Sequence, residues 1–179
     1  GNADPTYERP GQWVDIARAP RSSGSILKPL LYGMALQEGT ILPKALLPDV
    51  PTDFGGFAPK NFDGTYAGAI PADEALALSL NVPNVHLLRQ FGTMRLAEVL
   101  KRGGLLSLRR PADQYGLSLI LGGAEVRLAE VTEFYARMAA CYQAGDSVAG
   151  VAEARHIGQM KMLLGLAEEE AVPADMYKI

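Results

Sequence analysis

The chain has 179 residues, of which 48% are apolar and 21% are charged, and its formal net charge is -3. This length is typical of one domain, and this apolar content is enough to bury a sizeable core. The acidic balance and the lack of a basic stripe exclude nucleic acid as an expected partner. The single cysteine, Cys141, excludes an internal disulfide and is interpreted as a small buried hydrophobe.

The chain opens with a polar segment rich in proline and glycine, for which we predict a loop and one strand around Trp13–Ile16. From Ser25 to about Gln37 the apolar residues recur with a helical period, and Gly39 supplies a stop. Residues 39–71 hold much of the proline and glycine, which predicts a long structured loop. A loop of that length within a compact domain is usually functional.

Three shorter helices are predicted next, each bounded by proline or glycine. They cover Ala72–Leu78 after Pro71, the stretch from Pro83 to Gly92, and Met94–Arg102 with Thr93 as its cap. A long amphipathic helix follows the apolar run Leu117–Leu121 and ends at Gly145. Its apolar face is predicted to hold Leu128, Val131, Tyr135, Met138 and Tyr142. The tail from about Val151 is predicted to be helical, so the chain is helix-rich with few strands.

The sequence Ser25-Ile26-Leu27-Lys28 is the sharpest candidate for chemistry. Residues three apart on a helix share a face, so the lysine amine can reach the serine hydroxyl. A lysine whose pKa is lowered by burial can accept the serine proton and make the oxygen a nucleophile. The alternative is a helix cap followed by a surface lysine, and about 0.2 such pairs are expected by chance in this chain.

A second polar group, Ser79-Leu80-Asn81, follows the short helix after Pro71. The Ser79 hydroxyl could relay a proton to a leaving amine, and the Asn81 amide could hold a substrate carbonyl. The alternative is a polar helix end with Asn81 in a left-handed cap, and about 0.16 Ser-x-Asn matches are expected by chance.

Longer stretches surround both motifs. The first is Arg18-Ala19-Pro20-Arg21-Ser22-Ser23-Gly24-Ser25-Ile26-Leu27-Lys28-Pro29-Leu30-Leu31-Tyr32. The others are Asp49–Thr52, Pro59–Asp63, Glu74–Pro83 and Leu117–Val126. Together they resemble the transpeptidase domain of class A, bifunctional penicillin-binding proteins, most of all the 1C type. The resemblance spans about residues 1–147.

The resemblance implies an α+β fold of the penicillin-binding protein and serine β-lactamase type, and a peptidoglycan D,D-transpeptidase that cross-links the cell wall. Ser25 would attack the penultimate D-alanine carbonyl of a stem peptide, with Lys28 as its base. Ser79 would relay a proton and Asn81 would bind substrate. β-Lactams would mimic the stem peptide and leave Ser25 acylated. No cofactor or metal is expected, and the expected location is the periplasmic face of the bacterial inner membrane.

The third motif of the family, Lys-Thr/Ser-Gly on a strand beside the site, is absent, because none of the six lysines is followed by serine or threonine. We therefore expect a fragment, with a partial transpeptidase domain over 1–147 and an unassigned helical tail over 148–179. Missing C-terminal strands would explain the helix-rich pattern. The parent protein is expected to have a membrane anchor and a glycosyltransferase domain, and the fragment could associate with itself to cover apolar surface.

Two other function classes stay open. A serine β-lactamase would also hydrolyse the acyl-enzyme with an added glutamate and a held water, and the sequence does not show whether a glutamate reaches Ser25. A non-catalytic binding module could share the same fold. His86 and His156 are interpreted as structural or exposed, since no metal-ligand spacing joins them. Lys60 and Asp63 are interpreted as surface residues of the long loop.

Overall fold

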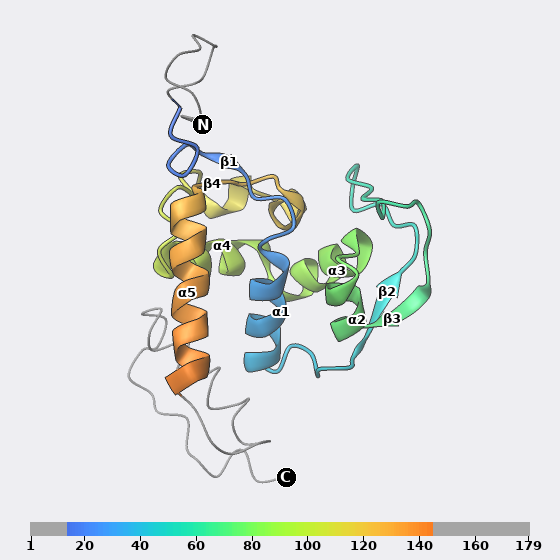
Figure 1. The fold of residues 1–179 in the computed structure, drawn as a ribbon. Helices are drawn as coiled ribbons and strands as arrows, with labels where there is room; N and C mark the ends of the chain where they lie inside the picture. Colours follow the sequence, from blue (N-terminus) through green and yellow to red (C-terminus); the bar gives the residue numbers. More distant parts are fainter. Residues whose placement is uncertain (1–13, 145–179) are drawn as a thin grey trace.

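The computed structural model describes residues 14–144, in which the other elements pack around a central helix, α1. In Figure 1, α5 lies on one side of α1, while α2, α3 and a two-stranded hairpin lie on the other. The elements in chain order are β1 (Arg21–Ser22), α1 (Lys28–Gln37), β2 (Leu46–Asp49), β3 (Gly68–Pro71), α2 (Ala72–Ala77), α3 (Asn81–Phe91), α4 (Thr93–Arg102), the 3-10 helices η1 (Ala112–Gln114) and η2 (Leu117–Leu121), β4 (Glu125–Val126) and α5 (Leu128–Ala144). Helices combined with small antiparallel sheets confirm the predicted α+β class.

Helix α1 begins at Lys28, three residues later than predicted, so Ser25 lies in the turn that leads into it. The Lys28 N–H donates to the Ser25 carbonyl at 3.1 Å, and this three-residue spacing closes a tighter turn than an α-helix does. Pro29 follows in the first helical turn, where its missing N–H is not needed. The predicted end is confirmed, because the helix ends at Gln37 before Gly39, whose φ is +67°.

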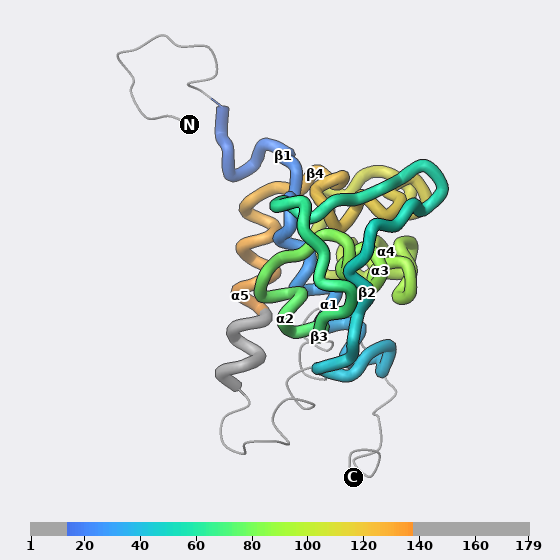
Figure 2. The backbone as a smooth tube through the Cα atoms, turned by 90° about the vertical axis from the view of Figure 1, so that its right-hand side faces the viewer, coloured from blue at the N-terminus to red at the C-terminus, as the bar shows by residue number. Residues whose placement is uncertain are grey.

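The predicted loop over residues 39–71 is wrong at two places, because strands β2 and β3 pair antiparallel within it. Leu47 faces Ile70 in the register and both are buried, whereas Leu46 is exposed, so the hairpin buries one face. Each strand has four residues including a proline, which weakens the sequence signal for a strand. Residues 50–67 remain a long loop, coloured teal in Figure 2.

A second small sheet pairs β1 with β4, which lie side by side in Figures 1 and 2. Ser22 faces Glu125 in the register, so this sheet brings a late part of the described chain beside the turn that holds Ser25. The strand predicted at Trp13–Ile16 is wrong over its described part. There the N–H groups of residues 18 and 19 donate to the Asp15 carbonyl and close a turn instead.

Helices α2, α3 and α4 confirm the three short helices predicted, with shifts at the starts of α3 and α4. Helix α2 begins directly after Pro71. Helix α3 begins at Asn81 rather than at Pro83, because a proline is tolerated in the first turn of a helix. Helix α4 begins at Thr93 itself and Gly92 takes the cap position, so the predicted Thr93 cap is wrong.

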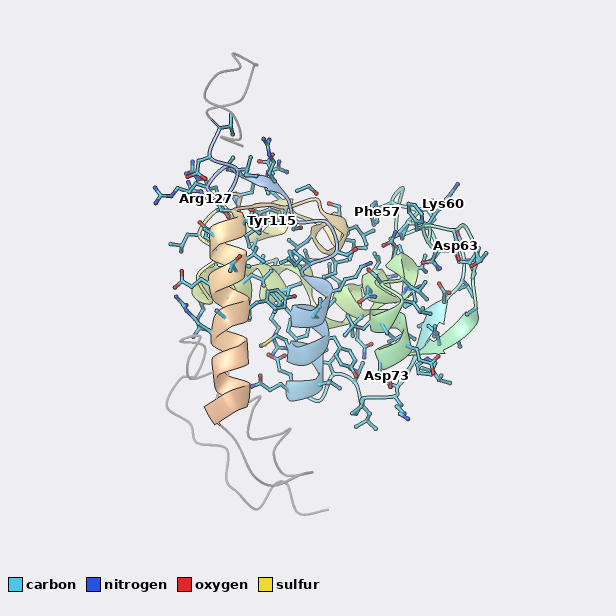
Figure 3. The ribbon with its side chains drawn as sticks, in the orientation of Figure 1. Phe57, Lys60, Asp63, Asp73, Tyr115 and Arg127 are labelled. Carbon is cyan, nitrogen blue, oxygen red and sulfur yellow. The ribbon has the colours of Figure 1, made fainter. Side chains whose placement is uncertain are left out.

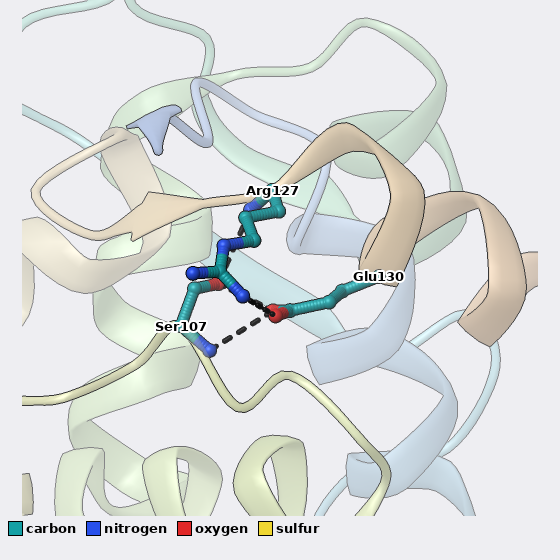
Figure 4. Close-up of polar contacts among 3 residues, drawn as sticks. All are labelled: Ser107, Arg127 and Glu130. Carbon is teal, nitrogen blue, oxygen red and sulfur yellow. Dashed lines mark hydrogen bonds and ion pairs between the residues drawn. The ribbon is translucent and has the colours of Figure 1, made fainter. Parts of the chain in front are cut away.

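Helix α5 confirms the predicted long helix, and a polar network joins its start to the loop after α4 (Figure 4). Glu130 accepts hydrogen bonds from the Ser107 N–H at 2.9 Å and from the Ser107 hydroxyl at 2.5 Å. Arg127 lies 3.4 Å from the other Glu130 carboxylate oxygen, and its main-chain N–H donates to Ser107 Oγ. Leu128 is exposed, so the apolar face of α5 begins at Val131 instead.

The core is one cluster of apolar side chains around α1 and α3, and it includes Leu27, Leu31, Val85, Leu88 and Ile120. Burying each such side chain contributes about 1.5–3 kcal/mol relative to leaving it exposed. None of the helices within residues 14–144 is long and apolar enough to cross a membrane. The predictions for the Met138 and Tyr142 side chains, for Gly145 and for the tail over 148–179 fall outside what the structure describes.

Candidate active site

Lys28 is a buried amine at the start of α1, with 1% of its surface exposed. Its Nζ donates to the Ser79 carbonyl at 2.6 Å and to Asn81 Oδ1 at 2.8 Å, and it lies 3.3 Å from Ser79 Oγ. A buried amine is costly unless polar partners satisfy it, and here two residues supply them. The structure thus brings together three of the four residues predicted for the site.

Burial lowers the pKa of Lys28 to about 8, so a useful fraction of the amine is neutral near neutral pH. A neutral amine has two N–H donors and one lone pair. The Ser79 carbonyl and Asn81 Oδ1 accept hydrogen bonds but cannot donate them, so they match the two N–H groups. The lone pair is then left for a hydroxyl, which is the arrangement that a general base needs.

Ser25 lies exposed in the turn before α1, and within the described residues its hydroxyl makes no hydrogen bond, including none to Lys28. In the same part of the chain its N–H donates to no carbonyl. Catalytic hydrogen bonds often tighten only when substrate binds. An exposed hydroxyl beside an unpaired N–H is therefore a suitable place for a reacting carbonyl, whose oxygen the N–H could stabilise.

The turn around Ser25 is held by residues far away in the sequence. The Ser22 hydroxyl donates to the Gly122 carbonyl at 2.8 Å. Tyr135 on α5 donates its hydroxyl to the Ile26 carbonyl at 2.6 Å, and burial raises the pKa of this phenol. Sequence reasoning missed both contacts, because nothing in the local pattern links these segments.

Ser79 lies in the tight turn between α2 and α3, and it is the one non-glycine residue with a positive φ, +53°, in the described part of the chain. A left-handed conformation costs roughly 1–2 kcal/mol for a residue with a Cβ. This turn presents the Ser79 carbonyl to Lys28 Nζ. The alternative with Asn81 in a left-handed cap is wrong, because Asn81 is the first residue of α3. Such strained positions concentrate at functional sites.

Two substitutions separate the backbone of Ser79 from its hydroxyl. Ser79→Gly should be more stable than Ser79→Ala by roughly 0.5–1 kcal/mol, because relief of the left-handed strain outweighs the chain entropy that glycine loses. Urea denaturation of the two variants measures the difference. Both variants lack the hydroxyl, so any loss of activity that they share reports on the hydroxyl alone. An alanine variant as stable as the glycine variant would show that the turn is not strained.

Asn81 links Lys28 to the loop between β2 and β3. Its Nδ2 donates to the Lys60 carbonyl at 2.8 Å, while its Oδ1 accepts from Lys28. The Lys60 and Asp63 side chains are exposed and lie on the outer loop in Figure 3, which confirms their interpretation as surface residues. Asn61, which is buried next to Lys60, is a residue that sequence reasoning missed.

His86 on α3 is half-buried and lies outside this network. Its Nε2 is 3.2 Å from the Thr52 hydroxyl, and its ring meets the Phe54 ring edge-on. Burial lowers the pKa of His86, and the nearby Arg89 lowers it further. These contacts support its structural interpretation, whereas His156 lies outside the described residues.

Residues 3–114 match the family model of the penicillin binding protein transpeptidase domain. Penicillin-binding protein 1C of Escherichia coli (strain K12) is 43% identical over 132 residues, which make up 74% of this chain and 17% of that protein. The chain therefore spans about a sixth of the length of this curated relative.

Solved structures share the fold. Penicillin-binding protein 1A from Haemophilus influenzae is 28% identical, with a TM-score of 0.59 over 69% of this chain and 19% of that chain. The PonA1 protein from Mycobacterium tuberculosis, solved in complex with penicillin V, is 24% identical, with a TM-score of 0.63 over 72% of this chain and 37% of that chain. On the match over residues 3–114 and this shared fold, the chain belongs to the penicillin-binding protein transpeptidase family.

Proposed function

We propose that this chain is part of a peptidoglycan D,D-transpeptidase in which Ser25 is the nucleophile. The observation that supports this most is the buried Lys28 amine, which is hydrogen-bonded to Ser79 and Asn81 and shares a turn with the exposed Ser25. A base with a lowered pKa beside an accessible hydroxyl is the arrangement that activates a serine.

In the first half-reaction the Lys28 lone pair takes the Ser25 hydroxyl proton while Ser25 Oγ bonds to the penultimate D-alanine carbonyl of a stem peptide. The carbonyl oxygen becomes an oxyanion, toward which the unpaired Ser25 N–H can donate. The amide bond to the terminal D-alanine then breaks, and its nitrogen leaves with a proton relayed from Lys28 through the Ser79 hydroxyl. The 3.3 Å between Lys28 Nζ and Ser79 Oγ supports that relay.

In the second half-reaction an amine of a neighbouring stem peptide attacks the Ser25 ester. The amine loses a proton through the Ser79 hydroxyl to Lys28 as its nitrogen bonds to the ester carbonyl. The bond from that carbonyl to Ser25 Oγ then breaks, Oγ regains a proton from Lys28, and the new amide is the cross-link. Asn81 can bind the substrate at the same time, because the Lys60 carbonyl occupies one of its two amide hydrogens and the other remains for a substrate carbonyl.

The Lys-Thr/Ser-Gly motif, which lies on the strand that supplies a second oxyanion donor in this family, is not among these 179 residues. We propose that the active protein is longer and carries this strand, a membrane anchor and a glycosyltransferase domain. It would then work at the periplasmic face of the inner membrane, on peptidoglycan stem peptides, and would be acylated by β-lactams. The exposed apolar side chains of the shorter chain would favour self-association.

Acyl-enzyme lifetime separates the transpeptidase from a serine β-lactamase. In the described residues no carboxylate hydrogen-bonds to Ser25 or Lys28, which supports a long-lived acyl-enzyme over one that a glutamate-held water hydrolyses. Nitrocefin should therefore be opened in an amount close to that of the protein and then stop, as followed by its colour change over hours with Ser25→Ala as the blank. Rapid multiple turnover would favour the β-lactamase, and the absence of any opening beyond that of the Ser25→Ala blank would favour a non-catalytic module.

A further inference from the structure

Asn61 is a buried side chain that uses its whole hydrogen-bonding capacity. It is 3% exposed and lies in the loop between β2 and β3. Its Nδ2 donates to Asp49 Oδ1 at 2.7 Å and to the Thr65 carbonyl at 2.9 Å. Its Oδ1 accepts from the N–H groups of Asn81 at 3.0 Å and of Val82 at 3.2 Å. Two hydrogens and two lone pairs are all in use, which fixes the orientation of the amide.

The oxygen of Asn61 acts as the cap of helix α3. The residue at the cap position, Leu80, has no polar side chain with which to bond the free N–H groups of the first turn. Asn61 supplies that acceptor from twenty residues earlier in the chain. Because the capped residue is Asn81, the same contact fixes the start of the helix that carries the partner of Lys28.

The other end of the Asn61 amide is held by a buried carboxylate. Asp49 is 1% exposed and ends strand β2. Its Oδ1 accepts from Asn61, and its Oδ2 accepts from the Ala67 N–H at 2.8 Å. Because Asp49 ends β2 and Ala67 directly precedes β3, Oδ2 ties the carboxylate to the hairpin, while Oδ1 holds Asn61. Asn61 is thus held by the sheet on one side and holds α3 on the other.

We infer that Asn61, anchored by Asp49, is a positioning residue that holds the Asn81 side chain against the Lys28 amine. Two neighbouring residues hold Asn81 by hydrogen bonds. The Lys60 carbonyl accepts from the Asn81 side chain, and the Asn61 side chain accepts from the Asn81 N–H. This leaves Asn81 Oδ1 aimed at Lys28 Nζ. Only the last step, from a positioned Lys28 to acylation of Ser25, rests on the proposed function.

The surroundings of Lys28 indicate how its pKa would change if Asn61 no longer held Asn81. Its hydrogen-bond partners, Ser79 and Asn81, are uncharged, and the charged residues that the network reaches are Lys60, through its main chain, and Asp49, through Asn61. Burial keeps the pKa of Lys28 near 8. If Asn81 moves away, the ammonium loses one acceptor, which lowers the pKa, but water can enter and solvate it, which raises the pKa. Because burial is what lowers this pKa, we expect the second effect to be larger, so the pKa rises toward its ordinary value.

The experiment measures Lys28 directly in the full 179-residue chain, by NMR titration of chains labelled with ¹³C at the lysine Cε, with Lys28→Ala to assign the signal. Asn61→Ala should raise the pKa of Lys28 from about 8 toward its ordinary value. Asp49→Asn should raise it less, because the new amide can still accept from Asn61 but presents an N–H to the Ala67 N–H.

Ser107→Ala is the matched control, because it also removes a side-chain hydrogen bond to a carboxylate, here from the Ser107 hydroxyl to Glu130 at the start of α5. It should lower the melting temperature while the Lys28 pKa stays unchanged. If Asn61→Ala does not fold, as judged by circular dichroism, the Lys28 titration of the Asp49→Asn chain tests the inference. Folded Asn61→Ala and Asp49→Asn chains whose Lys28 titrates as in the unchanged chain would overturn the inference.

A second experiment tests Ser25 as the nucleophile separately from the positioning role of Asn61. The same variants are incubated with fluorescent penicillin, and labelling is followed with Ser25→Ala as the blank. A shifted Lys28 pKa in the variants, together with no labelling that depends on Ser25 in the unchanged chain, supports the positioning role and contradicts the proposed nucleophile. Labelling that depends on Ser25 together with an unshifted Lys28 pKa contradicts the positioning role alone.

Discussion

Replacing Lys28 with alanine should slow the acylation of Ser25 by about 10²–10⁴-fold, because the buried amine in the same turn is the proposed base. Labelling with fluorescent penicillin, quenched at a series of times, gives the acylation rate for each chain. The matched control is Lys44→Ala, which removes an exposed lysine just after α1 and should leave the rate unchanged. A small primary amine added to the solution should restore part of the rate only in Lys28→Ala, since the substitution leaves space beside two acceptors.

The pH dependence gives a second measure of the same base. Only the neutral amine can take the Ser25 proton, and burial sets the pKa of Lys28 to about 8. Below that pH the acylation rate should rise roughly tenfold per pH unit, and above it the rate should level. A folded Lys28→Ala chain that is acylated as fast as the unchanged chain, or a flat profile between pH 6 and 9, would remove Lys28 from the reaction.

Replacing Gly122 with alanine should destabilise the chain by roughly 2–4 kcal/mol, because strain and crowding add at this position. Its φ is +97°, and a Cβ there would lie 2.5 Å from Ser22 Oγ and 3.0 Å from the Gly24 nitrogen. The Ser22 hydroxyl, which donates to the Gly122 carbonyl, would have to leave. Since these residues hold the turn before α1, acylation of Ser25 should slow as well.

Gly56→Ala is the control for backbone strain alone. Its φ of +92° is close to that of Gly122, but a Cβ at Gly56 meets nothing within 4 Å. It should therefore cost only about 1–2 kcal/mol in urea denaturation and leave acylation unchanged. Equal losses of stability in the two variants would show that the close approach of Gly122 to the Ser25 turn does not contribute to the free energy of unfolding.

The elements that could be predicted from sequence are those whose signals are local. Gly39 ends α1 where the pattern stops, and Pro71 opens α2, because the backbone limits of glycine and proline act within one turn. The four-residue strand Leu46–Asp49 could not be predicted, because Pro48 lies inside it and its paired residues are 19 to 25 positions further along the chain. Its stability comes from burial of alternate side chains, which is a property of the folded chain.

The same distinction holds at the site. The spacing of Ser25 and Lys28 places them in one turn, where the Lys28 N–H donates to the Ser25 carbonyl, and the longer stretch around them is needed to favour a site over a helix cap. The left-handed backbone of Ser79 has no sequence signal, because serine rarely adopts that conformation and the surrounding contacts impose it. The contact of Tyr135 with the Ile26 carbonyl joins residues 109 positions apart, so only the packing of α5 against α1 brings it about.

The position of a penicillin adduct tests the role of Ser25 most directly. The 179-residue chain is incubated with a large excess of penicillin over many hours, because a chain without the Lys-Thr/Ser-Gly strand should be acylated slowly. It is then digested and mapped by mass spectrometry, with the Ser25→Ala chain treated in parallel. The proposed chemistry predicts one penicilloyl group on the peptide that contains Ser25 and Lys28, and none on Ser25→Ala. An adduct on another residue, or one that persists in Ser25→Ala, would contradict Ser25 as the nucleophile.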